Sequence, residues 1–579
     1  MLAMEETLKR VRHEIGGSDI VLASQSNLSA SDCRSLLLKG SIAGYVAANE
    51  AEANSDKLGA AGWWIDQARG LWVLKRSASR HLLLVGDKTE IGGRMLITAR
   101  KAGYSTILIG EERNGSVRSI PIMQWLTERA AATAVYKANY LVTNISILAN
   151  KQWSYEAAFE DLFDSIGDHL RLPAAEIAQR KAAIVIGSLG AGGAERQATF
   201  TATGLAHGGK WVPVVAAMEL DPTKGADFFR LAIEKSGVPV SRIEMIVEDY
   251  DDPVLANALT RSLKYKLLNF HNLARAAISY AMHFRSEKPQ VVQTWMDYCN
   301  VLAGAGAALA GVPRIVLGGR SLAPDNFELF QPYMRSGYRA LLRRRPDIIF
   351  TNNSHAGAAD YARWLKLSPD RFKVIHNGFD FPPAEQVATE AAAMKIQLGL
   401  PPAAQVVGSV IRFSEEKRPH VLIDMAERVA RACPQTRFVF FGGGVMLEEI
   451  RNVVAKRGLS DKILLAGQTK NAWAACSIMD VFVLSSRAEG LPNVLIEAQS
   501  MGVPVVTTGQ GGMVETYKHG ETGITAQPAT ASGLAKAVIS LLNDAGKRDA
   551  YGRAAFHHAR SSFSIAQMIA ATSGVFESV

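Results

Sequence analysis

Strand-length apolar runs alternate with amphipathic stretches along most of the chain, and the rhythm is clearest from Lys181 onward. The run 182–189 is followed by a glycine-rich loop and then by a helical pattern that ends near His207, before two glycines. Glycine directly after a helical pattern is a common stop signal. Further apolar runs continue the alternation, namely WVPVVAAM, VVQTWM, RIVLGG and DIIFTNN. The pattern predicts a doubly wound, Rossmann-like parallel sheet.

A segment with one glycine and two prolines, 374–390, interrupts this alternation and is typical of a hinge between domains. A second alternating series begins at residue 405, with the runs QVVGSVIRF, RFVFFGGG, KILLAG, DVFVLSS, VPVVTT and TGITAQ. We therefore expect a second doubly wound sheet. Ligands of such sheets bind at the carboxyl ends of the strands, so a cleft between the two domains is the expected ligand site.

The beginning of the chain has strand-length runs of its own, at 81–87, 105–111 and 139–144, separated by helical stretches. This pattern predicts an additional, accessory α/β domain whose role the sequence does not indicate. A chain of 579 residues is long enough for three domains. The expected domains are 1–180, 181–382 and 383–579, the last with a final helix that crosses back.

Composition and charge indicate which partners and which cellular compartment to expect. The chain has 64 basic and 55 acidic residues, a net charge of +9, which favours phosphate groups, nucleic acid or an anionic membrane face without choosing among them. Its four cysteines are widely separated, which predicts no disulfide framework and favours a reducing compartment. The first residues carry charges where a signal peptide needs an apolar core. We expect a cytoplasmic protein that can rest on the inner face of a membrane.

Basic residues are concentrated in MRSGYRALLRRRPD, as Arg335, Arg339, Arg343, Arg344 and Arg345. A spacing of four places the first three on one helical face. Such a face is suited to anionic lipid headgroups, but basic residues near a helix C-terminus are also common without a partner. Both interpretations stay open. We expect no nucleic-acid partner, because no recognised binding motif accompanies the charge.

Two glutamates, Glu489 and Glu497, lie eight positions apart around a predicted helix start. Glu489 is expected at the carboxyl end of a strand, and Glu497 on the helix that follows, with Pro492 at its first position. The amide groups of such a helix start favour a phosphate. The pair predicts a site in which the amides hold a diphosphate while the carboxylates accept sugar hydroxyls. A solvated glutamate pair is the alternative. The segment between the glutamates is Gly490, Leu491, Pro492, Asn493 and Val494.

Residues 487–524 (RAEGLPNVLIEAQSMGVPVVTTGQGGMVETYKHGETGI) resemble the C-terminal signature of the retaining glycosyltransferases of group 1, family 4, whose fold is GT-B. The hallmark of that family is a Glu, seven residues and a second Glu, which Glu489 and Glu497 match. GSVIRFSEEKRPHVLI resembles its Gly-x-x-x-Arg-x-x-x-x-Lys region, VIHNGFD its linker strand and GAGGAERQ its N-terminal glycine loop. The resemblance covers the chain from Lys181 onward.

The resemblance implies an acceptor domain at 181–382 and a donor domain at 383–579 that binds a nucleotide-sugar, with a UDP-sugar favoured. It places Glu497 on the ribose and Glu489 near the donor sugar. Arg412 and Lys417 would neutralise the diphosphate as it leaves, which is the main electrostatic demand of the reaction. The glycines that match its donor-binding loops are Gly192, Gly193, Gly511 and Gly512.

The acceptor side departs from the family's pattern. Many members have histidines where this chain has Gln293 and Trp295, and some have a histidine where it has Arg320. Another branch carries arginine there, so we count Arg320 among the expected catalytic residues. Trp295 and Asp297 are candidates for acceptor contacts, with simple packing as the alternative.

No metal or other cofactor is expected to be essential. Residues 249–251 (DYD) have the form of the Asp-x-Asp motif of metal-dependent transferases, but they lie in an acidic, turn-rich loop and are interpreted as solvated. The expected function is retaining transfer of a sugar to a glycan or lipid-linked acceptor in polysaccharide biosynthesis. The alternatives are a hydrolase or epimerase of the same fold acting on nucleotide-sugars, and a binding module without catalysis.

Overall fold

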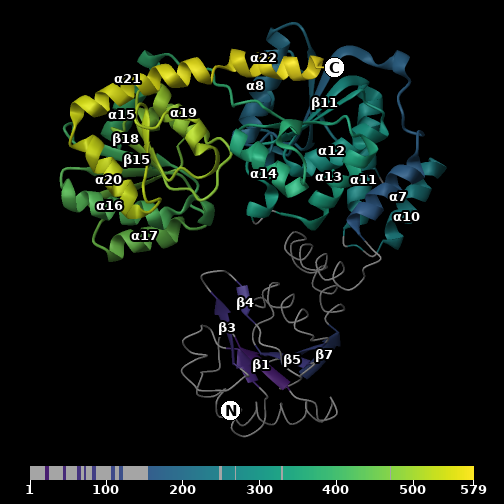
Figure 1. Ribbon diagram of the computed structural model, residues 1–579, viewed down its shortest axis with the longest axis horizontal. Coiled ribbons are helices and arrows are strands. Elements are labelled where there is room, and N and C mark those ends of the chain that lie inside the picture. The colour runs from purple at the N-terminus through teal and green to yellow at the C-terminus, as the bar shows by residue number, and fades with distance from the viewer. Residues whose placement is uncertain are drawn as a thin grey trace. The chain divides into compact units, whose positions relative to one another are not determined.

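The computed structural model describes seven strands within residues 20–121 and then residues 154–578, apart from 247–250, 266, 268, 328–329 and 470. The chain divides into two compact units, Met1–Tyr155 with Leu263–His271, and Glu156–Ser262 with Asn272–Val579. The described elements of both are drawn in Figure 1. The predicted strand at 139–144 and most of the acidic loop at 249–251 lie outside the described residues.

The first unit contains a seven-stranded sheet of order β4-β3-β2-β1-β5-β6-β7. Its inner pairs are parallel, and the edge pairs β3–β4 and β6–β7 are antiparallel. Two of its strands confirm the runs predicted at 81–87 and 105–111. The strands are β1 (Ile20–Ser24), β2 (Gly44–Val46), β3 (Gly62–Asp66), β4 (Leu71–Val73), β5 (His81–Val85), β6 (Thr106–Gly110) and β7 (Val117–Pro121).

The second unit begins with a parallel seven-stranded sheet of order β10-β9-β8-β11-β12-β13-β14, which we call the first Rossmann-like domain. Its strands are β8 (Ala178–Ser188), β9 (Val212–Glu219), β10 (Val240–Arg242), β11 (Pro289–Trp295), β12 (Arg314–Gly319), β13 (Ile349–Asn352) and β14 (Phe372–Val374). Its helices are α7 (Tyr155–Ile166), α8 (Gly193–His207), α9 (Arg230–Lys235), α10 (Pro253–Lys264), α11 (Phe270–Glu287), α12 (Asp297–Leu309), α13 (Pro332–Arg344) and α14 (His355–Leu365). The helix predicted to end near His207 is confirmed.

The second Rossmann-like domain has a parallel six-stranded sheet of order β17-β16-β15-β18-β19-β20. Its strands are β15 (Val406–Val410), β16 (Arg437–Phe441), β17 (Ile463–Gly467), β18 (Val481–Leu484), β19 (Val505–Thr507) and β20 (Gly523–Thr525). Its helices are α15 (Ala384–Gln397), α16 (Pro419–Ala432), α17 (Leu447–Lys456), α18 (Ala472–Ser477), α19 (Asn493–Ser500), α20 (Ala531–Leu542) and α21 (Ala545–Ser562). The two successive doubly wound sheets predicted from the apolar runs are thus confirmed.

The last helix, α22 (Ile565–Glu577), packs on the first Rossmann-like domain although it follows the second in sequence. Figure 1 shows it in yellow alongside α8. The ring of Phe576 meets that of Trp211 edge to face, with centroids 5.2 Å apart. Arg314 at the start of β12 donates a hydrogen bond of 2.6 Å to the carbonyl of Phe576. The C-terminal segment therefore links the two domains through the core of the first.

The arginines of α13 face carboxylates of α7. Arg343 pairs with both Glu156 and Glu160, and Arg339 Nη1 lies 3.9 Å from Glu156. Arg345 pairs with Asp347 at 2.7 Å. Two arginines of the helix face proposed for lipid headgroups, Arg339 and Arg343, are thus paired with carboxylates of the same domain.

Among the helices of the described residues, none is both long and apolar enough to span a bilayer.

Candidate functional site

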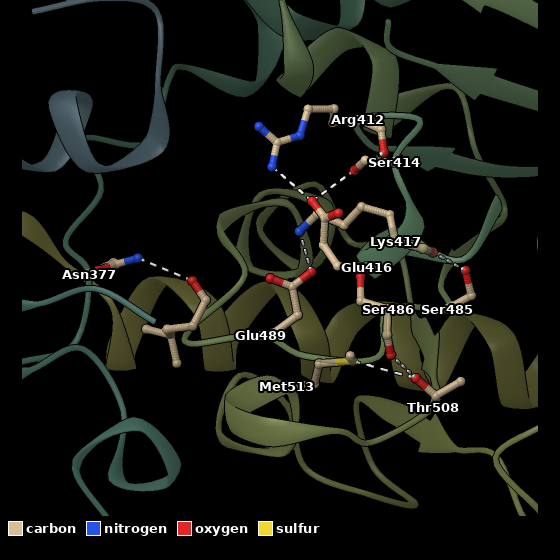
Figure 2. A network of polar contacts seen from close by, with 11 residues as sticks. Asn377, Arg412, Ser414, Glu416, Lys417, Ser485, Ser486, Glu489, Thr508 and Met513 are labelled. Carbon is tan, nitrogen blue, oxygen red and sulfur yellow. Dashed lines mark hydrogen bonds and ion pairs between the residues drawn. The ribbon is translucent and has the colours of Figure 1, made fainter. Parts of the chain in front are cut away.

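The carboxyl ends of two neighbouring strands of the second domain, β15 and β18, bring the predicted cations and Glu489 together. Glu489 follows β18, and Lys417 ends a short 3-10 helix, η5 (Glu415–Lys417), that follows β15. Lys417 Nζ donates a hydrogen bond of 2.6 Å to Glu489 Oε1, as Figure 2 shows. Glu489 is 8% exposed, so this pair is largely removed from water.

Arg412 is the second predicted cation, and it also has a carboxylate partner. Its Nη2 donates to Glu416 Oε1 at 2.8 Å, and the Ser414 hydroxyl donates to the same oxygen (Figure 2). Burial alone would raise the pKa of Glu416, but these hydrogen bonds outweigh it and lower the pKa. The Arg412 side chain remains 71% exposed and is therefore accessible to a ligand. Two cations and two carboxylates balance in charge, so an anion bound here needs further donors.

Hydroxyl groups hold these loops in place. Ser485, directly after β18, donates a hydrogen bond of 2.7 Å to the carbonyl of Lys417. Thr508, directly after β19, donates one of 2.8 Å to the carbonyl of Ser486. The loops after β15, β18 and β19 are therefore fixed to one another, which orients the Lys417–Glu489 pair.

The start of α19 supplies the further donors. The amides of Gly490, Leu491, Asn493 and Val494 donate no hydrogen bond to another described residue. Unpaired amides at a helix start carry partial positive charge and favour a phosphate. One detail of the expectation is wrong: Pro492 is the N-cap residue, and the helix begins at Asn493. The ring of Pro492 therefore ends the loop and does not form the first helical residue.

Glu497 lies on α19 with only 1% of its surface exposed. Its Oε1 accepts a hydrogen bond of 2.5 Å from Arg196 Nη2, a residue of α8 in the first domain. The Arg196 guanidinium also lies 5.6 Å from the centre of the Phe379 ring. The sequence pattern indicated the glycine loop before Arg196 but not this arginine. Its only signal was a basic residue at the start of a helix beside the glycine loop.

Asn377, in the linker segment after β14, connects the two domains at the same place. Its amide donates to Asn493 Oδ1 at 2.6 Å and to the carbonyl of Leu491 at 3.3 Å. Its own oxygen accepts a hydrogen bond from Arg320, at the end of β12. Asn377 is buried and thus couples the start of α19 to the first domain. The linker resemblance included this residue without giving it a role.

Glycines allow the close approach of these loops. A Cβ on Gly490 would lie 2.6 Å from Ser321 Cα of the first domain, and one on Gly193 would lie 3.1 Å from Asn493 Nδ2. The two domain faces therefore touch at these two points of the cleft that we expected between them. For a Cβ on Gly192, in contrast, the three nearest atoms would all belong to the side chain of the nearby Glu195.

Gly511 and Gly512 begin a 3-10 helix, η6 (Gly511–Glu515), that packs against the segment after β18. A Cβ on Gly511 would lie 2.2 Å from the carbonyl oxygen of Glu489, and one on Gly512 would lie 1.6 Å from that of Gly490. The amide of Gly512 donates to the Glu489 carbonyl at 3.0 Å. The backbone of η6 at these two glycines thus packs directly against the backbone of Glu489 and Gly490.

The acceptor-side candidates form two separate groups. Trp295 is buried, and the Arg320 guanidinium lies 4.2 Å from the centre of its ring. Burial lowers the pKa of Arg320 to about 9. Asp297 instead accepts hydrogen bonds of 2.8 Å from the hydroxyls of Tyr338 and Tyr361. Burial raises its pKa to about 6, against the effect of both tyrosines. Packing within the first domain thus accounts for the contacts of Asp297.

Part of the second domain matches a known protein family. Residues 391–558 match the family model of glycosyl transferases group 1. The matched segment lies within the second domain and contains Arg412, Lys417, Glu489 and Glu497. The match thus includes both glutamates and both cations of the candidate site.

One of two relatives resembles more of the chain than this segment. The Vi polysaccharide biosynthesis protein VipC/TviE of Salmonella typhi is 34% identical over 358 residues, which are 59% of this chain and 61% of that protein. The lipopolysaccharide core biosynthesis glycosyltransferase LpsE of Rhizobium meliloti is 31% identical over 153 residues, 26% of this chain and 44% of LpsE. The matched segments therefore span about half the length of these relatives.

A solved structure gives the fold. HepE of Anabaena, crystallised in complex with UDP, is 19% identical, with a TM-score of 0.54 over 69% of this chain and 100% of HepE. Together with the two parallel sheets described above, this likeness confirms the GT-B fold of two Rossmann-like domains. The N-terminal sheet is additional to it.

Proposed function

We propose that the protein is a retaining glycosyltransferase that moves a sugar from a UDP-sugar to a glycan or lipid-linked acceptor in polysaccharide biosynthesis. The observation that carries the proposal is the row of unpaired amides from Gly490 to Val494 between two buried carboxylates, with two cations beside it. This arrangement offers a phosphate its donors and offers sugar hydroxyls an acceptor on either side. The names of VipC/TviE and LpsE, and the UDP bound to HepE, agree with such a role.

The reaction breaks a bond between the sugar and a diphosphate, so negative charge develops on the leaving group. In our account the amides at the start of α19 bind the diphosphate, and Lys417 and Arg412 neutralise it as it leaves. Glu489, freed from Lys417, accepts hydroxyls of the transferred sugar and takes no covalent role. Glu497 exchanges Arg196 for the ribose hydroxyls when the domains separate. Because the protein's own cations serve the leaving group, we propose no essential metal.

A membrane-bound acceptor is part of the proposal for a cytoplasmic protein at the inner membrane face. It is supported by the net charge of +9 and by the exposed Arg344. Arg339, Arg343 and Arg345 already have carboxylate partners within the chain. Any contact with anionic lipid would therefore depend mainly on residues other than these three.

Product analysis tests the proposed activity. The full-length protein is incubated with UDP-sugars labelled in the sugar, with and without a lipid-linked oligosaccharide extract. We expect label in the acceptor fraction only when acceptor is present, and NMR of the product should show the anomeric configuration of the donor.

Three other outcomes would contradict the proposal. Free labelled sugar without acceptor indicates a hydrolase, and an isomerised nucleotide-sugar indicates an epimerase. Binding of the nucleotide-sugar with no turnover in any acceptor fraction indicates a binding module.

Glu489→Gln, which keeps the size of the side chain and removes its charge, is the matched control and should lose transfer.

A further inference from the structure

Two histidines and a glutamate meet where η6 of the second domain contacts α14 of the first. Glu515, the last residue of η6, accepts hydrogen bonds of 2.8 Å from the amides of His355 and Ala356 at the start of α14. His376, two residues after β14, points its Nε2 toward Glu515 Oε2. One nitrogen of each histidine and one oxygen of Glu515 all lie within 4.8 Å of one another.

The contact between His376 and Glu515 is unusual for a hydrogen bond. Nε2 and Oε2 are 3.5 Å apart, beyond the usual limit for a hydrogen bond between nitrogen and oxygen. Nε2 is shielded from water and has no hydrogen-bond partner among the described residues. In a tetrahedral zinc site with Zn–N and Zn–O bonds of about 2.1 Å, a nitrogen and an oxygen ligand are separated by ~3.4 Å. The observed separation therefore fits two ligands of one ion better than a donor and its acceptor.

Glu515 is prepared to act as an anionic ligand. Its two oxygens accept the amides of His355 and Ala356, and this fixes the carboxylate toward His376 Nε2. Its charge also offsets the partial positive charge of the α14 N-terminus, which would otherwise repel a cation.

We propose that His355, His376 and Glu515 form a binding site for Zn²⁺ that joins the two Rossmann-like domains. Two imidazoles and one carboxylate match the ligand preference of Zn²⁺ and not that of Mg²⁺ or Ca²⁺, which favour oxygen. A water molecule completes the tetrahedron. His355 is exposed and also lines a hollow of about 630 Å³ with Phe372 and Val575, so this ligand can be reached from solvent.

The ion would affect the donor site indirectly, by holding the two domains together. His355 and His376 belong to the first domain and its linker, whereas Glu515 belongs to η6, which packs against the backbone of Glu489 and Gly490. An ion held by all three therefore keeps the domain faces together, and in our account Glu497 takes the ribose only when they separate. Bound zinc is expected to slow transfer. This site is distinct from the residues that we assign to the diphosphate, and its binding of zinc does not depend on the proposed function.

Direct titration tests the proposal with untagged, full-length protein freed of metal by chelation. Zn²⁺ binding is measured by calorimetry, and Co²⁺ is used as a substitute whose visible absorption reports a tetrahedral site. We expect one zinc ion with ligands from this site per chain, a rise in Tm on its addition, and no effect of Mg²⁺. His355→Ala and His376→Ala should each weaken binding by ~10-fold or more and remove the rise in Tm.

His420→Ala is the matched control, because His420 also lies beside a carboxylate, 2.8 Å from Glu449, but without a second histidine. It should bind zinc as the unaltered protein does. Equal binding by all of these proteins would identify an adventitious ion only and overturn the proposal, as would the absence of binding by the unaltered protein. Each result is independent of sugar transfer, so it also remains interpretable if the proposed activity is not found.

Discussion

Replacing Lys417 by alanine is expected to lower kcat for sugar transfer by about 10²–10³, the usual effect of removing one group that stabilises charge in a transition state. The ammonium group of Lys417 is bound by Glu489, the residue directly before the unpaired amides, and the backbone of Lys417 is fixed by the hydrogen bond from Ser485 to its carbonyl. Because the diphosphate gains charge as the bond breaks, this cation contributes most in the transition state. The effect should therefore appear in kcat more than in KM.

Loss of stability is a second consequence of that substitution, since Glu489 would be left buried without its partner. The double variant Lys417→Ala/Glu489→Gln removes the unpaired charge. Thermal unfolding should show that it recovers much of the Tm lost in Lys417→Ala, while transfer stays low. Full activity in a folded Lys417→Ala variant would contradict the assignment of Lys417 to the leaving group.

Gly512→Ala is expected to have the second largest effect, on stability and on nucleotide binding together. The new Cβ would lie 1.6 Å from the carbonyl oxygen of Gly490 and 2.8 Å from Ser354 Cβ. No rotamer change relieves a clash with backbone, so η6 must move away from the segment after β18. Overpacking of this kind costs about 1–3 kcal/mol or more in the free energy of unfolding.

Gly187→Ala is the matched control for Gly512→Ala. Gly187 lies in β8, and a Cβ there would have no atom within 4 Å apart from those of Gly187 itself and its two neighbours in the chain. Urea unfolding should show a clear loss for Gly512→Ala and little change for Gly187→Ala. If both variants unfold at the same urea concentration as the unaltered protein, the close support of Gly490 by η6 is wrong.

Local patterns in the sequence were enough to predict most of the fold. Buried parallel strands are continuous apolar runs, so β8, β11 and β18 were recognisable without any knowledge of their neighbours. The spacing of Glu489 and Glu497 across a strand end and a helix start also predicted that both would lie beside the same row of amides.

Contacts that depend on the docking of domains could not be predicted in this way. Arg196 and Glu497 are 301 positions apart, and neither local sequence shows that the other is its partner. The same is true of Asn377, which contacts Arg320 on one side and Asn493 on the other. The pairing of α13 with α7 likewise uses arginines that, from sequence alone, resembled a free basic face.

The donor site is the central claim, and calorimetric titration of UDP into the full-length protein tests it most directly. Glu497→Gln is the informative variant, because the amide oxygen can still accept from Arg196 whereas the charged acceptor for ribose hydroxyls is lost. A hydrogen bond to a charged group contributes about 1.5–3 kcal/mol, so we expect UDP to bind the unaltered protein and to bind the variant ~10- to 100-fold more weakly. Glu448→Gln, an exposed glutamate of α17, should bind as the unaltered protein does. Absence of binding to UDP, GDP and ADP by the folded protein, or equal UDP affinity in Glu497→Gln, would contradict the account.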